Sequence, residues 1–101
     1  MRCYYVLVHG RLNWQAIDAA AGEHDHQRPS GFYCHRYVLA HNEHEATESA
    51  FRRVRRNLDH ETNWVGNGSA VLNLEAEEVT TASIHKLLMP ENRGHAFYED
   101  G

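Results

Sequence analysis

Arg36 is the residue of this sequence whose position most clearly suggests chemistry, because it stands in the middle of the aromatic segment GFYCHRYVLA. The aromatic and branched residue types around it predict a β-strand, where a charge is usually avoided. A guanidinium held on a strand beside His35 and Tyr37 could bind a carboxylate or phosphate through two parallel hydrogen bonds. The structural alternative is that its head pairs with Glu75, Glu77 or an acid in a loop. We favour this alternative, because structural ion pairs are commoner than binding sites.

Nine histidines are a second source of possible chemistry. His24 and His26, flanked by Glu23 and Asp25, would offer metal ligands on a loop. Zinc takes three or four ligands in tetrahedral geometry, and no second pair has a spacing that completes a known site. The sequence therefore argues against a metal site at His24 and His26, and it implies no cofactor. Protonation of all nine histidines would add nine charges to the formal net charge of −4 and bring it to +5.

Four arginines, Arg52, Arg53, Arg55 and Arg56, form the main local positive cluster. Arg52, Arg53 and Arg56 lie on the outer face of a predicted helix, where they would be the candidate contacts to nucleic acid. The chain has 14 acidic and 10 basic residues, and this face carries no interleaved aromatic residues. Cations near the end of a helix also complement its dipole. We therefore expect no nucleic-acid binding, and an acidic protein partner is an alternative for the cluster.

The two cysteines, Cys3 and Cys34, do not form a nucleophilic site in the sequence. Both fall inside predicted strands, and a reactive thiolate needs a helix N-terminus, a cation or a base nearby. His35 follows Cys34 directly, but neighbouring strand residues point to opposite faces. We interpret both as small buried residues in a reducing cytoplasm, although a disulfide between adjacent strands stays open. Because no other catalytic constellation is visible, we expect a protein that is not an enzyme.

The elements that position these residues follow from the hydrophobic pattern. Residues 2–10 and 32–40 predict strands, and Asn42 begins a helix with Glu45 in a capping-box arrangement. The first strand places Tyr4, Val6 and Val8 on one face and Cys3, Tyr5 and Leu7 on the other, and the buried stripe of the helix comprises Ala46, Ala50, Val54 and Leu58.

The remaining pattern predicts shorter elements. Asn13 would begin a short helix that ends at Gly22, and Thr81 would begin another that stops at Pro90. A half-exposed strand follows the turn at Gly66 and Gly68, with Ala70, Leu72, Leu74 and Ala76 on one face and Val71, Asn73, Glu75 and Glu77 on the other. Residues 94–98 predict an edge strand, and Trp14 and Trp64 are expected to fill the core at opposite ends of the sheet.

These elements predict an α+β fold in which residues 1–101 form a single domain. Its antiparallel sheet of three to four strands would carry one main helix on one face, in a ferredoxin-like or related arrangement, with additional short helices. The acidic outer face of residues 73–77 argues against helices on both sides. The tyrosine-rich second face of the first two strands must then be covered by residues 11–31 or by another subunit. We favour a homodimer.

The apolar run from Cys3 to Val8 is six residues long. A signal peptide or a membrane span needs a longer one, so we expect a cytoplasmic protein without membrane association.

The strand-to-helix segment resembles small uncharacterised bacterial α+β proteins that contain a domain of unknown function. The residues that carry the resemblance are Gly31, Phe32, Arg36, Tyr37, Val38, Ala40 and Asn42. The opening YYVLVHGRLNW and the closing GHAFYED are also similar to these proteins. The resemblance implies the fold and leaves the activity open.

We therefore expect a small cytoplasmic interaction module, homodimeric and non-catalytic, that binds a protein partner. The alternative function is a small-ligand-binding protein or enzyme with Arg36 as anion anchor and a nearby histidine as acid or base. A metal-binding or nucleic-acid-binding protein ranks behind both of these functions.

Overall fold

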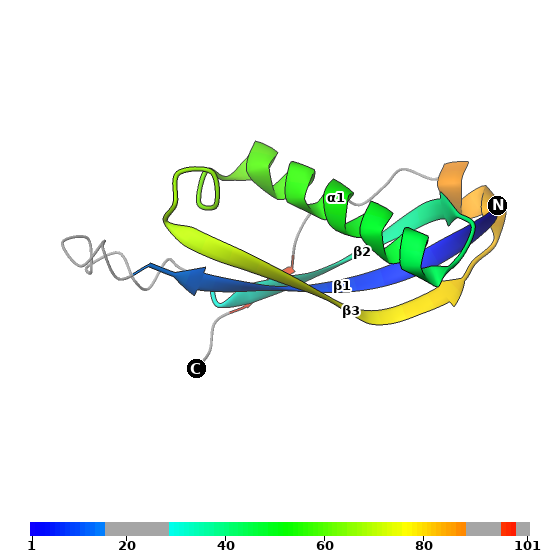
Figure 1. The fold of residues 1–101 in the computed structure, drawn as a ribbon, viewed down its shortest axis with the longest axis horizontal. Coiled ribbons are helices and arrows are strands. Elements are labelled where there is room, and N and C mark those ends of the chain that lie inside the picture. The colour runs from blue at the N-terminus through cyan, green and yellow to red at the C-terminus, as the bar shows by residue number, and fades with distance from the viewer. Residues whose placement is uncertain (16–28, 89–95, 99–101) are drawn as a thin grey trace.

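The computed structural model describes residues 1–15, 29–88 and 96–98. Four strands form one antiparallel sheet in the order β3-β1-β2-β4, as Figure 1 shows for the three long strands. The strands are β1 (Arg2–Trp14), β2 (Gly31–Ala40), β3 (Ala70–Thr81) and β4 (Ala96–Tyr98). Helix α1 (Glu43–Glu61) lies across one face, and the short 3-10 helix η2 (Ile84–Leu88) follows β3. The predicted α+β fold with one main helix on an antiparallel sheet is confirmed.

Strand β1 is the centre of the arrangement because it pairs with both β2 and β3. Both pairings are antiparallel, so β2 and β3 run parallel to each other on either side of β1. Helix α1 connects these two parallel strands, which makes β2-α1-β3 a split β-α-β unit. This unit places α1 over the middle of the sheet and leaves the opposite sheet face turned away from it (Figure 1).

Helix α1 begins where its capping residues predict. The side-chain Oδ1 of Asn42 accepts a hydrogen bond of 2.9 Å from the backbone N–H of Glu45, which satisfies one donor of the first turn. At the other end the backbone N–H of Thr62 donates to the carbonyl of Leu58 at 2.8 Å. The predicted stripe of the helix is confirmed, since all four of its side chains, Ala46, Ala50, Val54 and Leu58, are fully enclosed.

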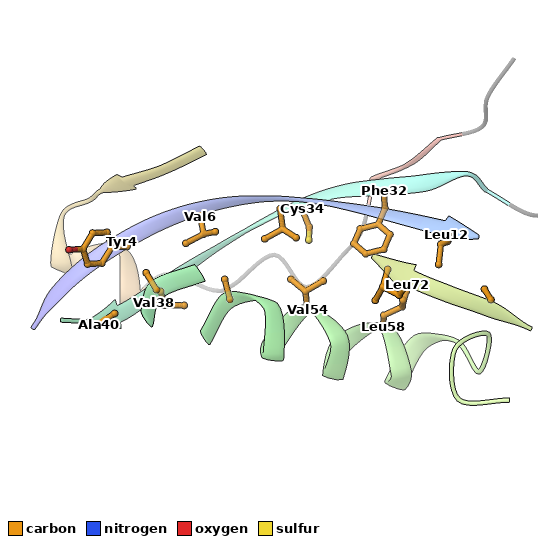
Figure 2. Close-up of a cluster of buried hydrophobic side chains, with 14 residues drawn as sticks. Tyr4, Val6, Leu12, Phe32, Cys34, Val38, Ala40, Val54, Leu58 and Leu72 are labelled. Carbon is orange, nitrogen blue, oxygen red and sulfur yellow. The ribbon is translucent and has the colours of Figure 1, made fainter. Parts of the chain in front are cut away.

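The core lies between this stripe and the sheet (Figure 2). The sheet contributes the fully buried side chains of Val6, Val8 and Phe32. They belong to one cluster with Val54 and Leu58 of α1. Gly10 is opposite Phe32 in the β1–β2 pairing, and a Cβ at Gly10 would collide with the Phe32 ring. A glycine at this position therefore makes room for the fully buried Phe32 ring.

The predicted short helix beginning at Asn13 is wrong for the residues that the structure describes. Strand β1 continues through Asn13 to Trp14, and Asn13 pairs with Val71 of β3. The reason is that the alternating pattern persists beyond Gly10, with Leu12 buried on the helix side of the sheet. The rest of that predicted helix, including Ile17 and Ala21, lies outside the described residues.

Strand β3 matches the alternating segment 69–80 of the sequence to within one residue at each end. Thr81 is its last residue and pairs with Tyr4, and the short helix predicted after it is present as the 3-10 helix η2, which begins at Ile84. The turn predicted at Gly66 and Gly68 is confirmed, with Gly68 at a φ of +83°. The predicted edge strand is present as β4, whose described residues pair with β2.

Trp14 and Trp64 do not occupy opposite ends of the sheet. Their rings contact each other edge to face, with centroids 5.2 Å apart. The turn after α1 returns the chain to the sheet there, and the backbone N–H of Ala70 donates to the carbonyl of Trp64 at 3.0 Å. The expectation was wrong because sequence separation did not reveal that the helix ends beside the last residue of β1.

Candidate functional site on the open face of the sheet

The sheet face turned away from α1, called the open face below, carries most of the polar and aromatic side chains with chemical potential. Among its residues are Tyr5, Leu7, His9 and Arg11 of β1, Tyr33, His35, Tyr37 and Leu39 of β2, Glu75, Glu77 and Glu78 of β3, and Tyr98 of β4. Tyr33 and Leu39 are 43% and 44% exposed. The open face thus combines apolar surface with ionisable groups, in contrast to the enclosed face under the helix.

His9 is buried on the open face, with only 6% of its surface exposed. Its Nδ1 lies 3.2 Å from Oε1 of Glu77, and its Nε2 lies 2.5 Å from the hydroxyl of Tyr98. The ring of Tyr33 stacks on the imidazole, with centroids 4.4 Å apart and planes 11° from parallel. Hydrogen bonds in the ring plane and a stacked ring above it therefore fix the orientation of the imidazole.

The pairing of the strands explains why these side chains meet. His9 is directly opposite Glu75 in the β1–β3 ladder, and Glu77 follows two residues later on the same face. A register shift lies between Leu7 and Val8 and leaves Glu77 as the extra residue of a β-bulge. Bulges of this kind are common beside functional sites, where they redirect a side chain.

Tyr98 reaches His9 on the same face, from the opposite edge of the sheet. It pairs with Gly31 on β2, and a Cβ at Gly31 would collide with the Tyr98 phenol. The absence of a side chain at Gly31 consequently lets the phenol lie over β2, where its hydroxyl contacts His9 on β1. The ring of Tyr33 also lies beside that of Tyr98, with centroids 5.6 Å apart.

A second aromatic group occupies the other half of the open face. The ring of Tyr5 is stacked on that of His35 at 5.6 Å and tilted against that of Tyr37 at 5.6 Å. Burial, followed by the nearby charge of Glu78 and by Tyr37, raises the pKa of the Tyr5 phenol. The Tyr5 phenol therefore stays protonated at neutral pH, within a half-buried aromatic group.

The acidic residues gather along β3 at one edge of the open face. Oε2 of Glu75 lies 4.0 Å from Nδ1 of His9 and 3.8 Å from Nη2 of Arg11. One nitrogen and two carboxylate oxygens, from His9, Glu75 and Glu77, lie within 4.8 Å of one another. Such a group can hold a cation. The hydrogen-bonded series Glu77–His9–Tyr98 can also place a proton on either ring nitrogen of His9.

Arg36 does not share a surface with His35 and Tyr37. It lies on the helix side of β2 with no exposed area, while the two aromatic residues lie on the open face. Its Nη1 donates to the carbonyl of His35 at 2.7 Å, and its Nη2 donates to Oδ1 of Asn57 on α1 at 2.8 Å. A ligand at the surface would not reach this guanidinium without displacement of the helix.

The acids expected as partners for Arg36, Glu75 and Glu77, point to the opposite face of the sheet. The helix supplies Asn57 instead, which the sequence did not single out because an amide carries no charge. Arg36 therefore links strand β2 to helix α1.

The arginine cluster is divided between two roles. Arg53 is partly buried, and its Nη1 donates to the carbonyl of Tyr37 at 2.9 Å, which attaches α1 to β2. Arg52, Arg55 and Arg56 are exposed, and with Asp59 and His60 they line a shallow, open depression. The predicted histidine ligands His24 and His26 lie outside the described residues.

The cysteines are both free and buried. They lie on opposite faces of the sheet, since Cys34 belongs to the core and Cys3 points to the other side, and they are not partners in the β1–β2 register. Burial raises the pKa of both thiols, and Arg36 lowers that of Cys34 by a smaller amount. Neither has the depressed pKa of a reactive thiolate.

Comparisons with known proteins add no family assignment. No protein-family model matches the chain, and neither the curated proteins nor the solved structures give a match. None of the described helices is long and apolar enough to cross a membrane. The geometry of the open face is thus the main guide to function.

Sequence reasoning missed the group around His9. Glu77 and Tyr98 are 68 and 89 residues away from it in the chain, so no local spacing connects them. The available signal was the alternation itself, which places His9 on the same face as Tyr5 and Leu7, and Glu75 on the same face as Glu77. What was not available was the register that brings these two strands together.

Proposed function

We propose that the protein is a small, non-catalytic interaction module that forms a homodimer through the open face of its sheet. The observation that carries this proposal is the half-exposed apolar surface there, where Tyr33 and Leu39 are more than two-fifths exposed beside Tyr5, Leu7 and Tyr37. An antiparallel sheet with one free face usually shows polar residues to water. A broad apolar and aromatic face instead favours burial against another protein.

A second copy of the chain can cover this face by sheet-on-sheet packing. Two sheets pack face to face with their strands nearly aligned, at a spacing of ~10 Å. A two-fold axis along the strands would place β1 of each copy over β2 of the other, so that Tyr5 and Leu7 meet the partner's aromatic strand. The same axis would place the acidic strand β3 over the short edge strand β4 of the other copy, which keeps the acids at the rim of the interface.

A further protein partner would use a different surface. The exposed Arg52, Arg55 and Arg56 of α1 lie on the outer side of the helix, away from the open face. Their charge suits an acidic partner. Two free, buried thiols agree with a reducing cytoplasmic location, and the resemblance to bacterial proteins stays a prediction. The alternative function anchored on Arg36 is less favoured, because its guanidinium is enclosed.

Light scattering of the purified protein at tens of micromolar tests the homodimer. The wild type should have twice the mass of one chain, and Leu39→Glu should be a monomer, because a charge would enter the buried interface. Ile84→Glu is the matched control, since Ile84 is an exposed aliphatic residue on η2, outside the open face. A wild type that is strictly monomeric, or a Leu39→Glu variant that stays dimeric, contradicts the proposal.

A further inference from the structure

We propose that His9, Glu75 and Glu77 form a binding site for one divalent transition-metal ion of the zinc class, on the β3 side of the open face. All three ligands come from one chain, so the inference does not depend on the homodimer. It differs from the histidine pair that the sequence suggested, because it uses a single imidazole with two carboxylates.

The distances between the ligand atoms suit a small metal ion. Zinc bonds to imidazole nitrogen and carboxylate oxygen are ~2.0–2.2 Å long, so two ligands of a tetrahedral ion lie about 3.4 Å apart. Nδ1 of His9 lies 3.2 Å from Oε1 of Glu77 and 4.0 Å from Oε2 of Glu75, values on either side of this spacing. The two glutamate side chains are 43% and 52% exposed, so they have room to close around an ion by rotation.

The backbone under the site is firmly held. His9 lies on the central strand β1, between β2 and β3, and Glu75 is its direct partner across the ladder. Glu77 is the extra residue of the bulge, so its carboxylate is presented to the same face without an opposing side chain on β1. The strand pairing therefore fixes the backbone spacing between His9 and Glu75, and the bulge sets the position of Glu77.

The outer partners of His9 are those that a metal-binding histidine requires. A ligating imidazole usually donates its other ring N–H to an oxygen, which fixes the tautomer and the ring orientation. Nε2 of His9 has the Tyr98 hydroxyl at 2.5 Å for this purpose, and the Tyr33 ring stacks on the imidazole. In the metal-bound state Nε2–H would donate to Tyr98, and the lone pair of Nδ1 would face the ion.

The exposed pair of His44 and Glu48 on α1 is a useful comparison, because it lacks the burial and the third ligand of the His9 site. Nε2 of His44 lies 3.1 Å from Oε1 of Glu48, nearly the same spacing as between His9 and Glu77. Its side chains are 82% and 61% exposed, whereas that of His9 is 8% exposed and has a third ligand within reach. A buried, oriented imidazole with two acids favours an ion, while an exposed pair at this spacing is an ordinary surface contact.

The ligand types narrow the class of ion. An imidazole with two carboxylates suits zinc, manganese or iron(II), whereas magnesium and calcium prefer oxygen ligands alone. Two carboxylates balance the charge of a divalent ion, and three protein ligands leave a coordination position open. Arg11 lies 3.8 Å from Glu75 and would have to turn toward solvent, which its exposed side chain allows.

Calorimetric titration of Zn²⁺ into chelator-treated protein without an affinity tag tests the site. The His24→Asn/His26→Asn background removes the other histidine pair. One ion should bind per chain, and Glu75→Gln and Glu77→Gln should each weaken binding by about 100-fold, because a neutral amide replaces a charged ligand. Glu48→Gln is the matched control and should leave the affinity unchanged. Equal weakening by Glu48→Gln, or no effect of the two ligand variants, overturns the proposal.

A second measurement separates the role of Tyr98 from folding. Tyr98→Phe keeps the ring and removes the hydroxyl, and it should lower the zinc affinity by about 10–100-fold while the protein stays folded. Bound Co²⁺ should give the intense visible absorption of a four-coordinate ion in the wild type and lose it in Glu77→Gln. A Co²⁺ spectrum that is the same as that of the ion in buffer overturns the proposal, since His9 then supplies no ligand.

Discussion

The two faces of the same sheet have opposite characters. Under α1, Val8 and Phe32 are fully enclosed and meet apolar neighbours. One residue further along each strand, His9 and Tyr33 lie on the open face and stack on each other. Alternation in a strand thus lets one set of residues stabilise the fold while the residues between them form a surface. A single sheet can therefore carry an apolar core on one face and a cluster of aromatic and acidic side chains on the other.

The largest difference in stability between the two faces is expected from substitution of two residues that are adjacent in sequence, Phe32 and Tyr33. Phe32→Ala should lower the free energy of unfolding by about 3–5 kcal/mol, because it removes a fully buried ring and leaves a cavity. Tyr33→Ala, one residue away on the open face, should cost about 1 kcal/mol or less. Urea unfolding at low protein concentration measures both. Equal losses would mean that both faces are structural core.

A smaller effect is expected at the buried polar link between Arg36 of β2 and Asn57 of α1. Asn57→Ala should cost about 1.5–3 kcal/mol, because it removes the acceptor of a hydrogen bond from the buried Arg36 guanidinium. Asn73→Ala, which changes an exposed asparagine on the other face of the sheet, is the control and should change stability by about 0.5 kcal/mol or less. Chemical unfolding of the two variants side by side measures the difference. A neutral Asn57→Ala would show that Arg36 does not depend on the helix.

The smallest effect is a loss of stability at alkaline pH to which both faces contribute. The pKa values of Cys34 on the helix side and of Cys3 and Tyr5 on the other side are raised by burial. The unfolded chain loses these protons first, so stability is retained below the ordinary pKa values and falls as the pH rises above about 9. Thermal unfolding between pH 7 and 10.5 measures this loss.

Cys34→Ala and Tyr5→Phe divide that loss between the faces. Each should flatten the alkaline limb of the profile relative to its own value at pH 7, because one titrating group has been removed. A profile that is unchanged in both variants would assign the alkaline loss to other residues.

Local pattern predicted the helix side of the molecule well. The cap at Asn42 and the enclosed stripe of α1 depend on spacings of three and four residues, which the sequence displays directly. The alternation of Tyr4, Val6 and Val8 likewise identified the core face of β1. Neighbouring residues determine all of these features, so they could be predicted from the sequence.

The features that were missed depend on contacts between distant segments. The contact between Trp14 and Trp64 requires knowledge of where the helix returns to the sheet. The partner that α1 supplies to Nη2 of Arg36 is an amide, and no charge pattern points to Asn57. The group at His9 needs the exact offset between β1 and β3 and the course of β4, neither of which hydrophobic periodicity encodes.

The bulge in β3 changes the parity of that strand. Before it, the even-numbered residues Leu72, Leu74 and Ala76 belong to the helix side, and after it the odd-numbered Val79 takes that side opposite Val6. With uninterrupted alternation, Glu78 would point into the apolar layer. A single additional residue thus inverts the second half of the strand, so that three carboxylates share one surface. Deletion of one residue there would therefore have more severe consequences than any single substitution in the strand.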